Sequence, residues 1–215
     1  MISIASTELW TRAAMLVAPL LVAVVFVVFA MRHMAREVEK RKEAWNRFAI
    51  ENRLKLSSEP SSWLRRGELH ITGQVGGMEL DISTYQVRAG KSTRTWVRVR
   101  TLGAGPAGSF SVQRENLLTR AGALIGMGGT DVGQPEFDKE FLVRSAPETL
   151  AAEVLDAPLR EHIAGLARQP RLSYTDGAID LVWHAGDDSK EQLSAAVQLH
   201  AMLRGAFVRM TRRVG

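Results

Sequence analysis

Hydrophobic residues form one unbroken run near the N-terminus, over residues 13–31 (AAMLVAPLLVAVVFVVFAM), in which no side chain is charged. A helix needs roughly 20 such residues to cross about 30 Å of hydrocarbon. Pro19 lies inside the run and is tolerated in lipid. A cleaved signal peptide is the alternative, but the basic N-terminal stretch of such a peptide is missing. The run therefore predicts a transmembrane helix over 13–31.

The next segment, residues 32–56, contains neither Gly nor Pro and repeats apolar residues at helical spacing. Pairs of Glu and Arg four residues apart, such as Glu37 and Arg41, add support for a helix. We therefore predict a basic helical stalk. Two uses remain open for it: a homodimer through a coiled coil over 34–56, and contact with anionic lipid heads.

The sequence SSEPSS over residues 57–62 breaks the helical pattern and predicts a linker before one folded domain, residues 63–215. In that domain, apolar and polar residues alternate over 68–85, 95–101 and 109–113. The first of these stretches is divided by a Gly-Gly pair, which is typical of a hairpin turn. Alternation with one polar face predicts antiparallel strands.

Helical patterns dominate the second half of the domain. We predict helices over 115–125, from the 145–148 box to about 155 and over 157–168, and a long C-terminal helix from residue 190. The last three are preceded by capping patterns at Ser145, Asp156 and Ser189. The long helix carries one apolar stripe, formed by Leu193, Ala196, His200, Leu203, Phe207 and Met210. With a strand over 141–144 and an Asp-Gly hairpin over 172–183, the whole predicts an α+β domain, an antiparallel sheet with packing helices.

Composition and charge refine this picture. The chain has 215 residues, no Cys and a net charge of +5, from 28 Lys and Arg against 23 Asp and Glu. Residues 32–55 hold eight Lys and Arg against four Glu, so +4 of the excess lies there. A protein that neutralises several phosphates needs a basic face on its folded part. The predicted domain is nearly neutral, so we expect no nucleic-acid partner.

The position of the charge also predicts an orientation, because cationic flanks stay in the cytoplasm. Residues 1–12 contain one Arg, so this N-terminus is expected outside and the domain in the cytoplasm, at the cell (inner) membrane. The expected partners are the lipid bilayer and an unidentified protein. The membrane-flanking residues are Trp10, Arg32, Arg36, Lys40, Arg41 and Lys42.

The segment GAGPAG, residues 103–108, matches the G-x-G-x-x-G pattern of nucleotide- and flavin-binding loops. That chemistry requires a buried parallel strand before the glycines and a helix after them, whose N-terminus faces the phosphates. Here alternating stretches stand on both sides. We expect a strand connection and no cofactor, and keep nucleotide or flavin binding through 103–108 as a weaker alternative. The Gly-rich stretch 126–133 lacks the Lys of a P-loop and is interpreted as a helix end followed by turns.

Four polar residues are candidates for a ligand surface. Asp131 and Asp138 do not make a metal site without a D-x-D-x-D-G loop, and no His spacing supports zinc. Arg98 and Arg100 share a predicted strand face and belong to a local basic patch with Arg88, Lys91 and Arg94. This patch could hold an anion, lie on the lipid surface or pair with acidic residues of the neighbouring hairpin. His200 is expected to be a core residue with one hydrogen bond. No catalytic residue is predicted.

One segment, G-x-P-E-F-D-x-E-F-x-V-x-S over Gly133–Ser145, resembles a segment of uncharacterised bacterial membrane proteins that carry an N-terminal anchor. The resemblance covers about residues 70–185. It implies core positions for Phe137 and Phe141 and turn hydrogen bonds for Asp138. It implies no activity.

Together these patterns predict a single-pass membrane protein that presents a cytoplasmic α+β binding or scaffold module and is not an enzyme. The alternative is a membrane-tethered enzyme that acts on a small phosphorylated or membrane-derived substrate through Asp131, Asp138 and nearby polar groups. A pocket with converging acidic and His side chains would favour the enzyme. A shallow apolar or basic surface would favour the binding module.

Overall fold

The structure is a computed structural model that describes residues 4–58, 68–90, 92–115, 129–167, 170–186 and 189–214. The chain divides into two compact units, Met1–Glu43 and Ala44–Gly215. The predicted helix over 115–125, apart from its first residue, and most of the predicted linker lie outside the described residues.

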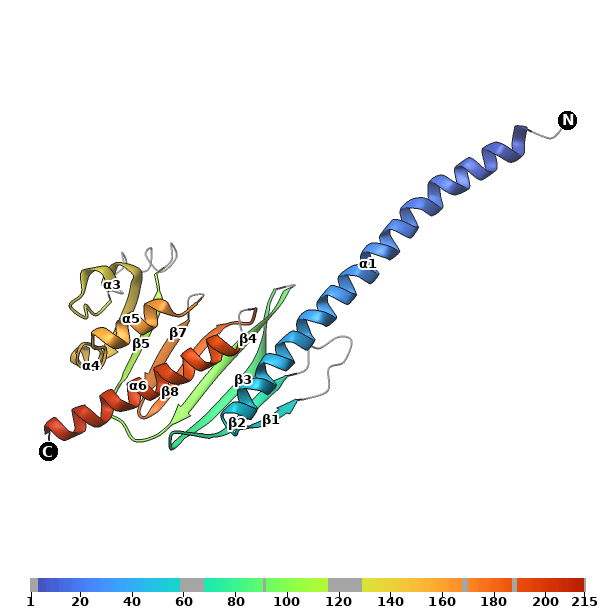
Figure 1. The fold of residues 1–215 in the computed structure, drawn as a ribbon. Coiled ribbons are helices and arrows are strands. Elements are labelled where there is room, and N and C mark those ends of the chain that lie inside the picture. The colour runs from blue at the N-terminus through green and yellow to red at the C-terminus, as the bar shows by residue number, and fades with distance from the viewer. Residues whose placement is uncertain are drawn as a thin grey trace. The chain divides into compact units, whose positions relative to one another are not determined.

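The described part of the first unit is helical and belongs to helix α1, Ile4–Glu51 (Figure 1). The side chains of α1 are described from Val22 onward, apart from Met34. Eight large apolar side chains in this unit are between 43% and 71% exposed: Val22, Val24, Val25, Phe26, Val27, Val28, Phe29 and Met31. Within the described residues, no helix combines the length and the apolar character that crossing a membrane requires.

The second unit is built on an eight-stranded sheet in the order β1-β2-β3-β4-β8-β7-β5-β6, in which every neighbouring pair is antiparallel. The strands are β1 Lys55–Ser58, β2 Leu69–Val75, β3 Met78–Ala89, β4 Ser92–Leu102, β5 Ser109–Arg114, β6 Phe141–Ala146, β7 Arg171–Thr175 and β8 Ala178–His184. The alternating stretches and both hairpins predicted from the sequence are confirmed as strands. The predicted α+β class is confirmed with them.

One apolar row crosses all eight strands and gives the sheet a single buried face. In register it runs Leu56, Ile71, Ile82, Val99, Leu181, Leu172, Val112 and Val143. Because successive side chains of a strand point to opposite faces, the neighbouring row lies on the other face. That row contains Asp81, Arg100, Asp180, Ser173 and Ser111, which are all partly accessible to solvent.

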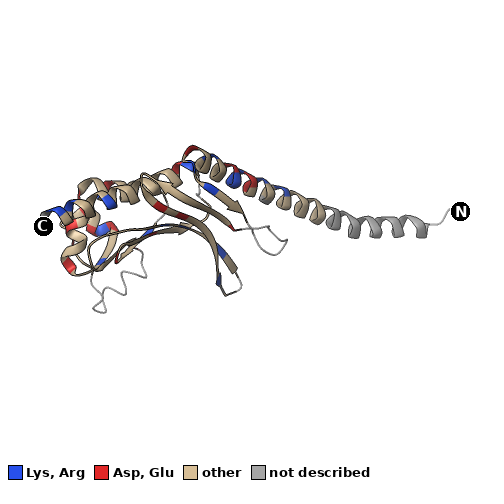
Figure 2. Ribbon diagram, turned by 90° about the horizontal axis from the view of Figure 1, so that it is seen from below, with Lys and Arg blue, Asp and Glu red and all other residues tan. Residues whose placement is uncertain are grey.

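Helices cover the apolar face of the sheet. They are α3 Pro135–Glu140, α4 Glu148–Val154, α5 Ala157–Gly165 and α6 Lys190–Val214. Figure 2 shows α6 lying along one side of the sheet, and α4 and α5 pack against α6. The predicted stripe of α6 is confirmed, since its residues are buried from Leu193 to Phe207 and Met210 is half-buried. α5 ends at Gly165, three residues earlier than the predicted 168.

The last two turns of α1 belong to the second unit. Trp45, Phe48 and Ala49 are buried in its hydrophobic core, which therefore takes in residues that the sequence assigned to the stalk. These three side chains are buried within one chain. A homodimer through 34–56, one of the two uses left open for the stalk, stays a prediction. The apolar spacing is the same for a dimer seam and for a helix that packs on its own domain, so sequence alone did not separate them.

The predicted helix over 32–56 ends earlier than expected, at Glu51. Arg53 adopts a positive φ of 55°, and the Leu54 amide donates a hydrogen bond to the Ala49 carbonyl at 2.8 Å, which closes the helix end. The chain then enters β1 at the edge of the sheet. Two residues of the predicted linker, Ser57 and Ser58, are part of that strand.

The predicted helix caps have two outcomes. Asp156 accepts a hydrogen bond from the Leu159 amide at 3.1 Å, and Ser189 accepts one from the Gln192 amide at 3.2 Å, so both of these caps are confirmed. The S-x-x-E box at Ser145 is wrong. β6 continues through Ala146, and the Ser145 hydroxyl accepts a hydrogen bond from the amide of Ala151, deeper in α4. Strand pairing with β5 therefore overrides the local capping pattern.

Candidate functional site

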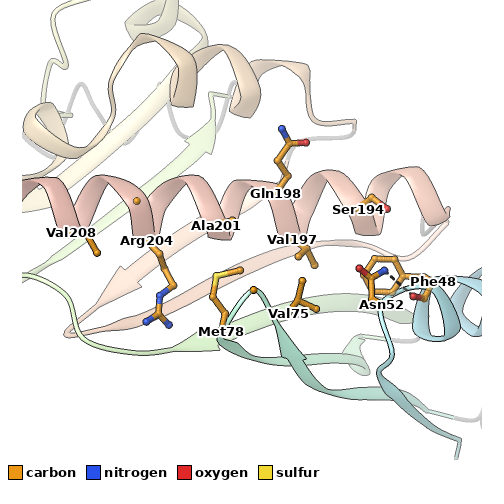
Figure 3. Close-up of a pocket in the computed structure, with 12 residues that line it drawn as sticks. Phe48, Asn52, Val75, Met78, Ser194, Val197, Gln198, Ala201, Arg204 and Val208 are labelled. Carbon is orange, nitrogen blue, oxygen red and sulfur yellow. Dashed lines mark hydrogen bonds between the residues drawn. The ribbon is translucent and has the colours of Figure 1, made fainter.

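An apolar groove of about 540 Å³ lies in the second unit, between the last turn of α1, the β2–β3 turn and α6 (Figure 3). Its apolar lining consists of Phe48, Val75, Met78, Val197, Ala201 and Val208. Polar side chains come from Asn52, Ser194, Gln198 and Arg204. A mostly apolar hollow with a few polar groups, in the range of about 300–1,000 Å³, is the usual form of a small-molecule site.

Helix α6 supplies most of this groove, because a second set of apolar residues follows the buried stripe around the helix. Val197, Ala201 and Val208 recur at helical spacing, and Val208 is 52% exposed. The groove therefore leaves apolar surface open to solvent. Sequence patterns did not predict it, since only the folded chain brings Phe48 and Met78 to this side of α6. The one available signal was the apolar residues of α6 outside its main stripe.

Arg204 places a positive charge at one end of the groove, and Asn52 lies at the other (Figure 3). Arg204 Nη1 donates a hydrogen bond to the carbonyl of Leu102 at 3.0 Å, which ties the guanidinium to the end of β4. The Asn52 amide group is held in the same way, by donating to the Phe48 carbonyl at 2.9 Å. The groove can therefore hold a ligand whose larger part is apolar and whose anionic or polar group lies near Arg204.

The predicted ligand-surface residues Arg98 and Arg100 lie on the open face of the sheet, away from the groove. Arg100 stands between Asp81 on β3 and Asp180 on β8, and its Nε lies 3.8 Å from Asp180 Oδ1. His70 Nε2 lies 2.9 Å from Asp81 Oδ2. Arg100 thus does pair across strands, but with β8 rather than with the neighbouring hairpin. Two hollows of about 580 and 450 Å³ meet at Asp81 and Arg98.

Asp138 has a structural part in the turn before α3. Its Oδ1 accepts a hydrogen bond from the Val132 amide and its Oδ2 accepts one from the Gln134 amide, each at 3.1 Å. Both oxygens of the carboxylate are therefore engaged by the backbone. Phe137 and Phe141 are buried on either side of it and stack with ring centroids 4.5 Å apart, as core positions.

The segment GAGPAG forms the connection between β4 and β5, and the predicted strand connection is confirmed. A strand follows the glycines, so this segment has no helix N-terminus to face a phosphate. Its glycines are required by close packing. A side chain at Gly105 would meet the Tyr174 hydroxyl, and Gly108 has a φ of 120° and lies against the Ala146 carbonyl. The letters match a nucleotide loop, but the spatial arrangement does not.

His200 is fully buried on α6, and its Nδ1 lies 2.8 Å from Thr101 Oγ1. Burial lowers the pKa of His200 to about 3, so the ring is neutral at pH 7. The prediction of a core histidine with one hydrogen bond is confirmed. Asp131 is exposed, and no group of three or more metal-ligating side chains gathers anywhere in the described part of the chain.

Comparison with known proteins adds little to this geometry. No family model and no curated protein matches the sequence. Among solved structures, the mycobacterial trehalose monomycolate transport factor A (TtfA) is similar, with a TM-score of 0.48 and 10% identity. The match covers 79% of this chain and 93% of that chain. We carry neither a function nor a binding partner over from this likeness.

Proposed function

We propose that this protein is a membrane-associated binding module, attached through residues 13–31 and binding a small apolar or amphiphilic ligand in the α6 groove. One observation carries the membrane attachment: the apolar side chains from Val22 to Met31 are exposed on α1. Exposed apolar surface costs free energy in water in proportion to its area. Contiguous surface of this kind is typical of protein or membrane contact sites.

The charges that follow this surface support a membrane as the contact and give it a direction. Arg32 and Arg36 come directly after Met31, and Lys40, Arg41 and Lys42 follow within the next six residues. Lys40 and Lys42 pair with Glu37 and Glu39 at 3.0 and 3.7 Å, in exposed positions where such pairs are weak. Basic residues on this side support a cytoplasmic position for the second unit, because cationic flanks are retained in the cytoplasm.

The groove supports the binding part of the proposal. It offers an apolar floor, and Arg204 provides the charge that an anionic end group requires. Neither Asp131 nor Asp138 faces it, and its lining contains no carboxylate and no histidine. The apolar and uncharged polar side chains that line the groove, together with Arg204, are suited to holding a ligand.

Two measurements test the membrane attachment. The full chain is expected to remain in the membrane fraction after alkaline carbonate extraction, whereas a chain that lacks 13–31 is expected in the supernatant. A reporter that is active only in the cytoplasm, fused after Gly215, is expected to give signal. Release of the full chain by carbonate would contradict the attachment, and signal only from an exported reporter would contradict the direction.

The groove is tested with anilinonaphthalene sulfonate, an apolar fluorophore with one anionic group. Ala201→Trp fills the groove, whereas Ala164→Trp places the same bulk on the exposed side of α5. We expect Ala201→Trp to weaken dye binding by roughly tenfold relative to Ala164→Trp, equivalent to about 1.4 kcal/mol. Equal binding by the two variants would show that the dye lies elsewhere and that the groove is not the site.

A further inference from the structure

The β3–β4 hairpin extends beyond both of its neighbours in the sheet. On one side β2 begins at Leu69, whose amide donates to Thr84 Oγ1 at 2.8 Å, and on the other β8 ends at His184, opposite Trp96. Beyond these positions the two strands continue to pair with each other as far as Ala89 and Ser92. Among the described strands, the end of the hairpin is therefore a two-stranded ribbon that extends beyond the rest of the sheet.

The projecting ribbon is basic. Between Tyr85 and Trp96 the sequence contains Arg88, Lys91 and Arg94 and no acidic residue. Arg88 and Arg94 are both exposed. Arg94 pairs in register with Val87 and Arg88 with Thr93, so the two arginines lie at neighbouring positions on opposite faces of the narrow ribbon. Figure 2 shows Lys and Arg, and no Asp or Glu, on this end of the hairpin. The rest of the domain is close to neutral, so the charge is local.

Apolar and aromatic side chains accompany these arginines. Val87 is 43% exposed at the tip. At the base of the ribbon, Tyr85 and Trp96 are directly opposed across the strands and both are half-buried. The Trp96 ring meets the His184 ring edge-on at 5.6 Å. Aromatic rings with one polar edge, next to cations and an exposed aliphatic residue, are the combination found at membrane–water interfaces.

We propose that the tip of the β3–β4 hairpin binds the surface of an anionic bilayer, as a second membrane contact in addition to residues 13–31. The contact rests on the proposed function, since attachment through 13–31 keeps the domain near a bilayer. Arg88 and Arg94 meet the lipid phosphates, and Val87 enters the headgroup layer. Nucleic acid is a poorer partner for this tip, because phosphate-backbone binding needs a broad basic face and here the basic surface is confined to a narrow ribbon.

The absence of Cys allows a direct test with single-cysteine labels on the full chain. Thr93→Cys puts an environment-sensitive dye at the tip, and Glu79→Cys puts it at the opposite end of the same hairpin, both at exposed positions. The labelled protein is reconstituted in vesicles of phosphatidylcholine with one third phosphatidylglycerol. Headgroup-nitroxide lipid then quenches any dye that lies at the bilayer surface.

We expect strong quenching at the Thr93→Cys label and little at the Glu79→Cys label. Quenching at the tip should also fall in vesicles of pure phosphatidylcholine. In the anionic vesicles, Arg88→Ala and Arg94→Ala should each lower the equilibrium constant for binding of the tip to the bilayer by roughly fivefold. Equal quenching at the two labels would overturn the contact, because the tip would then lie no closer to the bilayer surface than the opposite end of the hairpin.

The outcomes also separate this proposal from the proposed function. If the chain does not float with the vesicles, the membrane attachment fails and the hairpin contact fails with it. If the chain floats but the Thr93→Cys label is not quenched, only the hairpin contact is wrong. If the fluorescence of the Thr93→Cys label changes with the density of protein in the vesicles but is not quenched by the nitroxide lipid, the tip contacts a second copy of the chain. That result would also overturn the bilayer contact.

Discussion

Gly108 and Asp176 exchange two hydrogen bonds across 68 residues of sequence. The Gly108 amide donates to Asp176 Oδ1 at 2.9 Å, and the Asp176 amide donates to the Gly108 carbonyl at 3.0 Å. The last glycine of GAGPAG is therefore joined to the turn of the β7–β8 hairpin. Each of the two motifs was visible in the sequence as a local pattern. In the fold, the glycine-rich connection is shaped by the turn against which it packs.

Gly108→Ala tests this relationship. The position has a φ of 120° and faces the Ala146 carbonyl, so a Cβ is both strained and in collision. Backbone strain alone is expected to lower the free energy of unfolding by about 1–3 kcal/mol. The collision adds to this loss. Ala104→Ser, at an exposed position of the same connection, should stay within about 0.5 kcal/mol of the wild type. Urea denaturation of both variants measures the difference.

Phe141→Ala is expected to cost about 3–5 kcal/mol, because the ring is buried and stacks on Phe137. Asp138→Ala should cost less, about 1–2 kcal/mol, through the loss of two hydrogen bonds to backbone amides. Chemical denaturation of the two variants ranks the two losses. A Phe141→Ala protein with the wild-type midpoint would show that this ring contributes nothing to the core.

The position of the domain boundary is tested by truncation. A chain that begins at Ala44 keeps Trp45 and Phe48, whereas a chain that begins at residue 57 loses both, together with half of β1. Each aromatic residue contributes about 3–5 kcal/mol when fully buried, so the loss of both is comparable to the whole stability of a typical domain, about 5–15 kcal/mol. We expect chain 44–215 to unfold cooperatively on heating and chain 57–215 to aggregate or to lack a transition. Equal melting curves would place the aromatic pair outside the core.

His200 makes stability depend on pH. Its pKa is near 3 in the folded chain because of burial, and an unfolded His titrates near 6.5. Between these values the unfolded state binds the extra proton, so stability rises with pH and is lost as pH falls from about 6.5 toward 3, by at most about 1.4 kcal/mol per unit. His200→Gln should flatten the slope between pH 6 and 4 relative to the wild type. Parallel slopes for the two proteins would show that His200 does not titrate on unfolding.

The candidate site was the part that the sequence predicted least well. Arg98 and Arg100 were correctly placed on one strand face, because period-two alternation depends only on local backbone geometry. The groove was not predicted, since Phe48, Met78 and Val208 come from three separate elements and no local pattern relates them. The extension of the β3–β4 hairpin was not predicted either, because it depends on where the neighbouring strands β2 and β8 end.

By itself, the sequence determined strands β2 to β8, the two glycine-containing hairpin turns, the caps at Asp156 and Ser189 and the buried stripe of α6. All of these arise from interactions between residues close in the chain, whose periodicity and turn chemistry are readable directly. Only the tertiary structure decided that Trp45 packs into the domain core rather than along a stalk. It also decided that Ser145 stays in a strand, because pairing with β5 satisfies the backbone there. Contacts distant in sequence settle such competitions, since burial and strand pairing outweigh local preferences of about 1 kcal/mol.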